Sequence, residues 1–292
     1  MPTIHKQRVE AGSLTFNDPS SLPPGAVSCG IDVLDGWKNS PEPDVVATDL
    51  GLMRDGMELG AVFPVRARYL VVGGWGLGVD EENAELLHDS LARDAFPRDK
   101  LLKMVRYEAV PKYVWYRRSG ALETEWDAVE NGFRWQTTLV CADPFKYSVS
   151  QEMDSAGTAG VSETGMSFPV TFPLSFTTVA AGSTDTTAGI INHGTAPSRS
   201  FSAVITGPLS DGGWRLRNDT TDEELWFDTG LGPSETLTLD FARQIVYLNG
   251  FPYVGKKSGD WFALQPGDND IRLYADFNAS TTVTVTAESA WE

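Results

Sequence analysis

The sequence predicts two domains: an α+β domain, in which an antiparallel, barrel-like sheet carries one helix, followed by an all-β sandwich. The first observation is length, because 292 residues suggest about two domains at roughly 150 residues each. The second is a single helical segment in the first half, residues 79–96. The third is a series of short alternating strands in the second half, with turn signals about every 8–12 residues.

A proline break sets the boundary between the predicted domains. The strand that ends at Cys141 runs into Asp143-Pro144, and proline has no N–H with which to continue a sheet. A passage rich in serine, glycine and threonine follows. We therefore expect one domain over residues 1–148 and a second over 149–292, with 149–165 as the linker.

The helix of the first domain has clear sequence signals. Val79 would act as a hydrophobic staple and Asp80 as the N-cap, while Leu87 and Leu91 share one apolar face. A proline directly after the segment stops the helix. The strands around it are expected at residues 26–37, 65–75, 101–109, 112–118 and 133–141, with a hairpin turn at Asn131-Gly132 before the last one.

One of these strands shows a half-buried alternation. Val65, Ala67, Tyr69 and Val71 alternate with Arg66, Arg68 and Leu70, which predicts a half-buried strand that becomes fully buried.

The second domain contains strand patterns only. Phe201, Ala203 and Ile205 share one face of the first strand, and Asn249-Gly250 is a hairpin turn. The expected strands cover residues 200–207, 214–218, 224–228, 235–241, 243–253, 260–264, 270–277 and 281–291. Many short strands with regular turns are typical of a sandwich.

The charge of the chain argues against several partners. The net charge is −17, with −6 in residues 1–148 and −11 in residues 149–292. Such acidity disfavours sequence-specific nucleic-acid binding and binding to anionic membranes. No apolar run reaches the roughly 20 residues of a membrane helix, so we expect no membrane insertion. The first residues lack an apolar signal core, which predicts synthesis in the cytosol.

The glycine-rich run after residue 72 resembles a dinucleotide-binding loop only superficially. Gly73, Gly74, Gly76 and Gly78 do not keep the G-x-G-x-x-G spacing, and the helix then opens with three carboxylates that would repel a pyrophosphate. We expect no cofactor. The glycines would instead allow a tight turn or the close approach of a neighbouring chain.

Other residues of catalytic type lack partners at recognisable spacing. The acidic clusters do not fit a calcium-binding loop, so no metal is expected. Surface roles are expected for the histidines, and no catalytic motif appears, which predicts a protein that is not an enzyme. The histidines are His5, His88 and His193, and the acidic clusters are Asp219/Asp222/Glu223/Glu224 and Asp268/Asp270.

The two cysteines do not form a disulfide scaffold. Cys29 and Cys141 both lie in strand-like runs and are most simply buried thiols, although a bridge between them stays open.

Three tryptophans of the second domain raise the alternative of a sugar site. Tryptophan rings stack on sugars in many binding modules, and Trp214, Trp226 and Trp261 could do so here. The simpler interpretation is that these rings pack in the core or at an interface.

The first half resembles the N-terminal domain of siphophage distal tail proteins, the Dit family. The order of its motifs matches: a strand with a turn at Asp35-Gly36-Trp37, a turn at Asp55-Gly56, the strand PVRARYLVVGG, the helix, and a closing strand that ends in ADPFKYS. The second half is similar to the galectin-like sandwich of actinophage minor tail proteins, through NHGTAPSRSFSAVITGP, LDFARQIVYLNG and FALQPGDNDIRLY. The glycine-rich run and the long Ser/Thr segment from Val149 to Ile190 depart from the family pattern.

The resemblance implies a structural virion protein at the tail tip of a long, non-contractile-tailed phage. Such proteins form a homo-hexameric ring through which DNA passes, made of N-terminal belt domains. The ring joins the tail tube protein to the tail-tip hub protein and to receptor-binding proteins. Candidate subunit contacts are the exposed aromatics Tyr113, Trp115 and Tyr116, and Asp143-Pro144 would be the interdomain hinge.

Two alternatives of other classes remain at this point. One is an adhesion protein that binds a host glycan through the tryptophans of the sandwich. The other is a glycoside hydrolase, whose only support is the abundance of carboxylates.

Overall fold

The computed structural model describes residues 7–42, 47–49, 57–59, 66–127, 129–157, 187–209, 213–255, 257–275 and 281–292. The chain divides into two compact units. Unit 1 comprises Met1–Val149 together with Trp291–Glu292, and unit 2 comprises Ser150–Ala290. Each has its own buried apolar core. The two units are described separately below.

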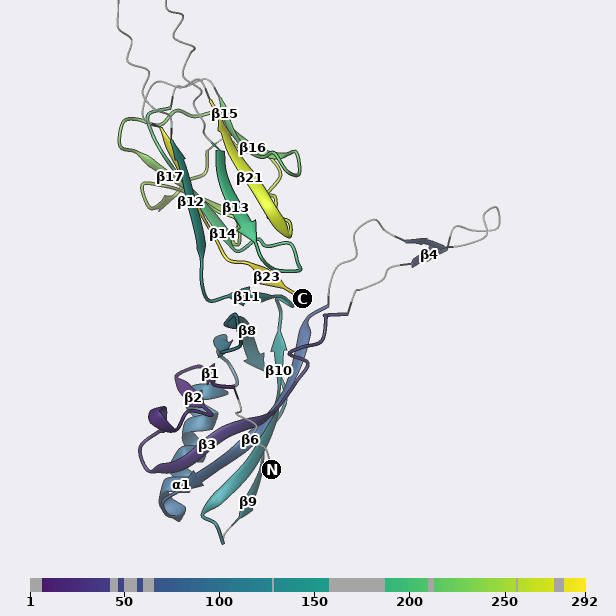
Figure 1. Cartoon of the computed structure of the whole chain (residues 1–292), viewed down its shortest axis with the longest axis vertical. Coiled ribbons are helices and arrows are strands. Elements are labelled where there is room, and N and C mark those ends of the chain that lie inside the picture. Colours follow the sequence, from purple (N-terminus) through teal and green to yellow (C-terminus); the bar gives the residue numbers. More distant parts are fainter. Residues whose placement is uncertain are drawn as a thin grey trace, which may run out of the picture. The chain divides into compact units, whose positions relative to one another are not determined.

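Unit 1 is a strand-rich unit with one α-helix among its described residues. Its strands pair antiparallel in a nearly closed sheet, in the order β2-β1-β7-β8-β10-β6-β3, with β9 beside β10 and β11 beside β8. Figure 1 shows α1 lying against this sheet. The elements are β1 (Val9–Ala11), β2 (Leu14–Phe16), a 3₁₀ turn (Pro19–Ser21), β3 (Ala26–Asp35), β4 (Ala47–Asp49), β5 (Met57–Leu59), β6 (Arg68–Gly78), α1 (Glu81–Ser90), a π-helical turn (Leu91–Ala95), β7 (Leu102–Arg106), β8 (Lys112–Arg118), β9 (Glu123–Asp127), β10 (Gly132–Cys141) and β11 (Lys146–Ser148).

Helix α1 begins where the capping signal predicts. The Asp80 carboxylate accepts a hydrogen bond from the Asn83 N–H at 2.8 Å, which satisfies one of the free donors of the first turn. Leu87 and Leu91 are buried as expected. The staple expectation is wrong, because Val79 is 65% exposed and contacts no apolar partner that would hold it.

In strand β6 the buried set is the one that contains Arg68 and Leu70. Arg68, Leu70 and Val72 point into the core, whereas Tyr69 is 62% exposed. The alternation alone could not decide which face is buried, because both sets contain apolar residues.

The glycine-rich run belongs to β6 itself and does not form a turn. A Cβ at Gly74 would lie 1.9 Å from the Gly30 carbonyl oxygen on β3, and one at Gly76 would lie 2.6 Å from the Phe133 ring. A Cβ at Gly78 would lie 2.4 Å from the backbone nitrogen of Ala84 in α1. The glycines therefore let strands and helix of the same chain approach closely.

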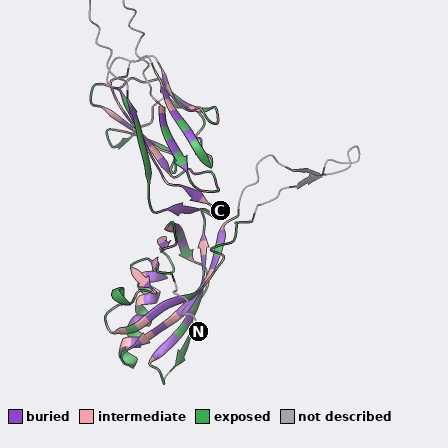
Figure 2. Ribbon diagram, viewed as in Figure 1, coloured by how far each residue is buried: buried purple, intermediate pink, exposed green. Residues whose placement is uncertain are grey.

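Unit 2 is a sandwich of two antiparallel sheets, and this confirms the predicted fold class. One sheet has the order β12-β22-β14-β17-β18-β19 and the other β13-β21-β15-β16-β20. Buried and exposed residues alternate along the strands, with the buried side facing the opposite sheet (Figure 2). The strands are β12 (Glu152–Gly157), β13 (Thr187–Asn192), β14 (Phe201–Thr206), β15 (Trp214–Asn218), β16 (Glu223–Phe227), β17 (Thr236–Asp240), β18 (Ile245–Leu248), β19 (Phe251–Pro252), β20 (Lys257–Gly259), β21 (Gly267–Tyr274) and β22 (Thr282–Ala287). The last strand, β23 (Ala290–Trp291), belongs to neither sandwich sheet, and its Trp291 is part of unit 1.

At two predicted hairpin turns the backbone has the positive φ angles that such turns need. Asn249 and Gly250 have φ of 50° and 83° between β18 and β19, and Asn131 has φ of 48° before β10. The turn expected at Asp55-Gly56 lies outside the described residues.

The expected linker is wrong over part of its length. Residues Glu152–Gly157 form β12, which pairs with β22 at the edge of the sandwich. Residues 158–165 lie outside the described part of the chain. Within the described residues, no helix is long and apolar enough to cross a membrane.

Candidate functional site

The junction at the end of unit 1 is built around two buried cations, Arg68 and Lys146, which are 3% and 6% exposed. The Arg68 guanidinium donates from Nε to the Pro144 carbonyl at 2.7 Å. Its Nη1 donates to the carbonyls of Gly36 at 2.7 Å and Asn39 at 2.6 Å. One side chain thus fastens the end of β3 to the segment that follows β10.

Lys146, the first residue of β11, complements this arrangement. Its Nζ donates to the Trp37 carbonyl at 2.9 Å. Burial is the main cause that lowers the pKa of Lys146 to about 8; the nearby cations Arg68 and Lys112 act in the same direction, while Glu108 opposes them. Burial also lowers the pKa of Arg68. Sequence reasoning missed both residues, because the alternation along β6 does not say which of its faces is buried.

The structure brings the predicted hinge residues into this same junction. Asp143 accepts hydrogen bonds from the Phe145 N–H at 3.1 Å and from the Tyr147 hydroxyl at 2.7 Å. Pro144 is buried, and its carbonyl is held by Arg68. The segment is therefore held within unit 1 by hydrogen bonds that involve Arg68, Asp143 and Tyr147.

A hollow lies on the outer face of the sheet formed by β3, β6, β10 and β9. It consists of two adjoining depressions, of about 330 and 500 Å³, which share Glu125 and Arg134. Gly73 forms part of its floor, and the absence of a side chain there leaves room between Val33 and Gln136. We call this surface the acidic hollow, because its lining includes the carboxylates of Asp32, Glu123, Glu125, Asp127 and Glu130.

The expectation of three exposed aromatics on β8 is wrong for two of them. Tyr116 is 1% exposed, and its hydroxyl donates to the Ala95 carbonyl inside the core. Tyr113 is 5% exposed, because the Lys103 ammonium covers its ring at 3.7 Å from the centroid. Trp115 is 43% exposed and remains available for contact.

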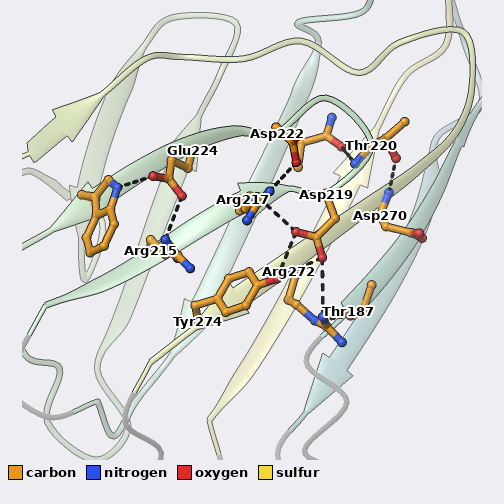
Figure 3. Close-up of polar contacts among 12 residues, drawn as sticks. Thr187, Arg215, Arg217, Asp219, Thr220, Asp222, Glu224, Asp270, Arg272 and Tyr274 are labelled. Atoms are coloured by element: carbon orange, nitrogen blue, oxygen red, sulfur yellow. Dashed lines mark hydrogen bonds and ion pairs between the residues drawn. The ribbon is translucent and has the colours of Figure 1, made fainter.

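The outward face of the sheet containing β15, β16 and β21 carries a network of paired charges (Figure 3). Asp219 accepts from the Tyr274 hydroxyl at 3.1 Å and lies 3.4 Å from Arg217 and 3.6 Å from Arg272. Arg217 is also paired with Asp222. Opposite charges on neighbouring strands of this face thus neutralise one another.

Only one of the three predicted sugar-stacking tryptophans presents an open ring. Trp214 is buried and stacks on Phe227 with a centroid distance of 4.4 Å. Trp261 is half-buried and packs edge-on against Phe241. Trp226 is 41% exposed, with the Arg215 guanidinium 5.0 Å from its ring centroid.

The remaining candidates occupy ordinary structural positions. Cys29 and Cys141 are buried and unbridged, and burial raises the pKa of each thiol to about 12. His88 is bonded to Thr124 at 3.0 Å, and exposed His193 lies 3.4 Å from Glu152. No group of three metal-ligating side chains occurs among the residues that the structure describes. His5 lies outside those residues.

Comparisons with known proteins agree with this architecture. Residues 193–291 match the family model described as "Siphovirus-type tail component, C-terminal domain". The crystal structure of the Dit protein of phage SPP1, which its authors describe as a paradigm of the hub adsorption apparatus in phages that infect Gram-positive bacteria, aligns with a TM-score of 0.62. That alignment has 13% identity and covers 97% of this chain and 99% of the SPP1 protein.

Two structures of the phage p2 baseplate in its activated conformation also align, with lower scores. The calcium-bound form gives a TM-score of 0.47 at 11% identity, covering 97% of this chain and 98% of the p2 chain. The strontium-bound form gives 0.46 at 12% identity, covering 96% and 98%. No curated protein matches the sequence. Residues 193–291 are thus similar to the C-terminal domain of siphovirus-type tail components, and nearly the whole chain has the fold of the SPP1 Dit protein.

Proposed function

We propose that this chain is the distal tail hub protein of a long, non-contractile-tailed phage, and that it acts as a structural virion protein at the tail tip. One observation carries the proposal: the SPP1 Dit fold spans almost the whole chain, and a siphovirus tail-component domain matches its second unit. Six copies form a ring that joins the tail tube protein to the tail-tip hub protein and the receptor-binding proteins. The chain is made in the host cytoplasm before assembly.

The proposal involves no catalysis, since the role of a hub is to connect other proteins. Two carboxylates of the acidic cluster at residues 219–224 have ion-pair partners in the structure. Asp219 and Asp222 pair with arginines on the sandwich face. The net charge of −17 suits a ring through which DNA must pass without adhering.

In this proposal Asp143 and Pro144 fix the position at which the chain leaves unit 1. The hydrogen bonds of Pro144 with Arg68 and of Asp143 with Tyr147 support this role. Replacing Pro144 with glycine should leave both units folded and broaden the small-angle scattering profile of the whole chain. An unchanged profile would remove Pro144 from this role.

Localisation in the virion provides the direct test. Gold-labelled antibody against the chain should mark the end of the tail opposite the capsid, and mass spectrometry should detect the chain in purified tails. The native mass of the assembled species should be six times 31.8 kDa. Absence of the chain from purified tails would overturn the proposed function.

A further inference from the structure

The acidic hollow of unit 1 has the character of a docking surface for a cationic partner. Its lining contains five carboxylates but only one basic side chain, Arg134. Arg134 lies 3.4 Å from Asp32, so the one guanidinium is already directed at one wall of the hollow. The carboxylates of Glu123 and Glu125 on β9 are exposed beside it. The hollow therefore keeps a net negative charge.

Apolar surface accompanies that charge. Val33 is 42% exposed, while Trp75 and Leu77 are half-buried in the lining. A small inorganic cation would leave these groups in water. A surface that combines cationic heads with aromatic or aliphatic bodies would cover them and satisfy the carboxylates at the same time.

The same unit carries such a surface on β7 and β8. Lys103 and Trp115 are directly opposite in the β7–β8 register, and Arg117 lies two residues further along the same face of β8. Tyr113 shares that face, with the Lys103 ammonium over its ring and Trp115 edge-on to it at 6.3 Å. We call these four residues the cationic face; Trp115 and Arg117 are exposed.

The distribution of charge selects a second copy of the chain as the partner. Two chains of net charge −17 repel each other unless they meet through unlike surfaces. DNA is excluded as the occupant, because its phosphates would face five carboxylates. The hollow on β3, β6, β9 and β10 and the cationic face on β7 and β8 are different surfaces, so a contact between them is head-to-tail, which is the geometry that can close a ring.

We propose that the acidic hollow of one copy receives the cationic face of the next, with Trp115 over the apolar floor and Lys103 and Arg117 toward Glu123 and Glu125. The proposal rests on the proposed function, because it names the contact by which the hub ring closes. Gly73 suits such a contact, since a Cβ there would occupy the space between Val33 and Gln136, at 3.5 and 3.7 Å from their Cβ atoms.

Charge reversal and charge exchange test the contact in solution. The doubly substituted chain Glu123→Lys/Glu125→Lys and the doubly substituted chain Lys103→Glu/Arg117→Glu should each lose the ring in native mass measurements and electron micrographs. A 1:1 mixture of the two should recover a ring of alternating variants. The reversed hollow of one variant meets the reversed face of the other, and the remaining contact pairs an unaltered acidic hollow with an unaltered cationic face. The matched controls are Glu82→Lys and Lys38→Glu, which reverse exposed charges outside both surfaces and should keep the ring.

Cross-linking in the virion covers the case in which the isolated chain stays monomeric. The variant Trp115→Cys/Glu125→Cys should give a ladder of covalent oligomers in purified tails treated with a short bismaleimide. The native thiols should not react, because both are buried. Each single-cysteine variant should give no ladder.

The outcomes separate this contact from the proposed function. If both charge-reversed variants still formed rings, or if the double-cysteine tails gave no ladder, the contact would be overturned while the hub role stayed intact. A chain that is missing from tails and monomeric in solution would overturn both.

Discussion

The two units differ in how their surface charges are arranged: unit 2 pairs opposite charges on one face, and unit 1 places them on separate surfaces. On the sandwich face of unit 2, Arg215, Arg217 and Arg272 each lie within 3.6 Å of a carboxylate on the same sheet. In unit 1 the five carboxylates of the acidic hollow and the basic residues of the cationic face lie on different strands. A surface that neutralises itself has little need of a partner, whereas separated charges of opposite sign invite association.

The same contrast holds for cations inside and outside the core. Arg68 is buried and donates to three backbone carbonyls, while the arginines of the sandwich face are partly exposed to solvent. Buried hydrogen-bonding groups cost more to leave unpaired than exposed ones. Substitutions in the two places should therefore differ strongly in effect.

Loss of Arg68 should have the largest effect on stability. Arg68→Met removes the donors for the carbonyls of Gly36, Asn39 and Pro144, and we expect unit 1 to lose about 3 kcal/mol of unfolding free energy. The matched change on the sandwich face, Arg215→Met, should cost less than about 1 kcal/mol. Urea unfolding combined with hydrogen exchange, which assigns each transition to a unit, measures both. Equal losses would contradict the distinction.

Filling a strand glycine should come next. Gly74→Ala places a methyl group 1.9 Å from the Gly30 carbonyl oxygen, so β3 and β6 must separate, at a cost of about 1–3 kcal/mol. Gly189→Ala in β13 of unit 2 is the control, because the nearest heavy atoms to its Cβ lie at 4.0 Å. That change should alter stability by less than about 1 kcal/mol. Thermal unfolding of both variants gives the comparison, and a harmless Gly74→Ala would show that the strands can adjust.

The buried ammonium of Lys146 should give unit 1 a distinctive pH dependence. Its pKa in the folded state is about 8, below the ordinary value of 10.5 in the unfolded chain. Between these values the unfolded state holds more protons, so the contribution of this group to stability increases as pH rises from about 8 to 10.5. The cysteine thiols act in the opposite direction, because burial raises their pKa to about 12.

A difference measurement isolates the Lys146 term. The unfolding free energy of the wild type minus that of Lys146→Met should rise across this window, since the thiols are common to both chains. Lys257→Met, at an exposed position of unit 2, should show no such trend. A flat difference for Lys146→Met would mean that the ammonium stays solvated in the folded chain.

Much of this architecture was predictable because it depends on local patterns. The Asp80 cap, the Asn249-Gly250 turn and the alternating strands of the sandwich depend on neighbouring residues. The buried face of β6 did not follow from sequence, since Leu70 and Val71 are both apolar and alternation does not say which set faces the core. The same limit explains why Tyr116 was expected at the surface, whereas Tyr113 is covered by Lys103.

The candidate surfaces required three-dimensional information. The acidic hollow gathers Asp32, Gly73 and Glu125 from three strands far apart in the sequence. Arg68 and Lys146 are likewise 78 positions apart, and only the fold shows that both are directed at backbone carbonyls. Sequence spacing carries no signal for such sets, because the strand pairing that joins them is long-range.

The smallest expected effect concerns Trp226, the exposed tryptophan of the sandwich face. Its indole N–H donates to Glu224 at 2.7 Å, and Arg215 lies over its ring, so nearby polar groups of this face already have partners. We therefore expect Trp226→Ala to change stability by less than about 1 kcal/mol and to leave tail assembly and host adsorption unchanged. Trp226→Tyr, which keeps an aromatic ring, is the control. If adsorption fell for Trp226→Ala but not for Trp226→Tyr, with tails intact, stacking on a host glycan would have to be added to the role of unit 2, and the internal pairing of its charges would not make it inert.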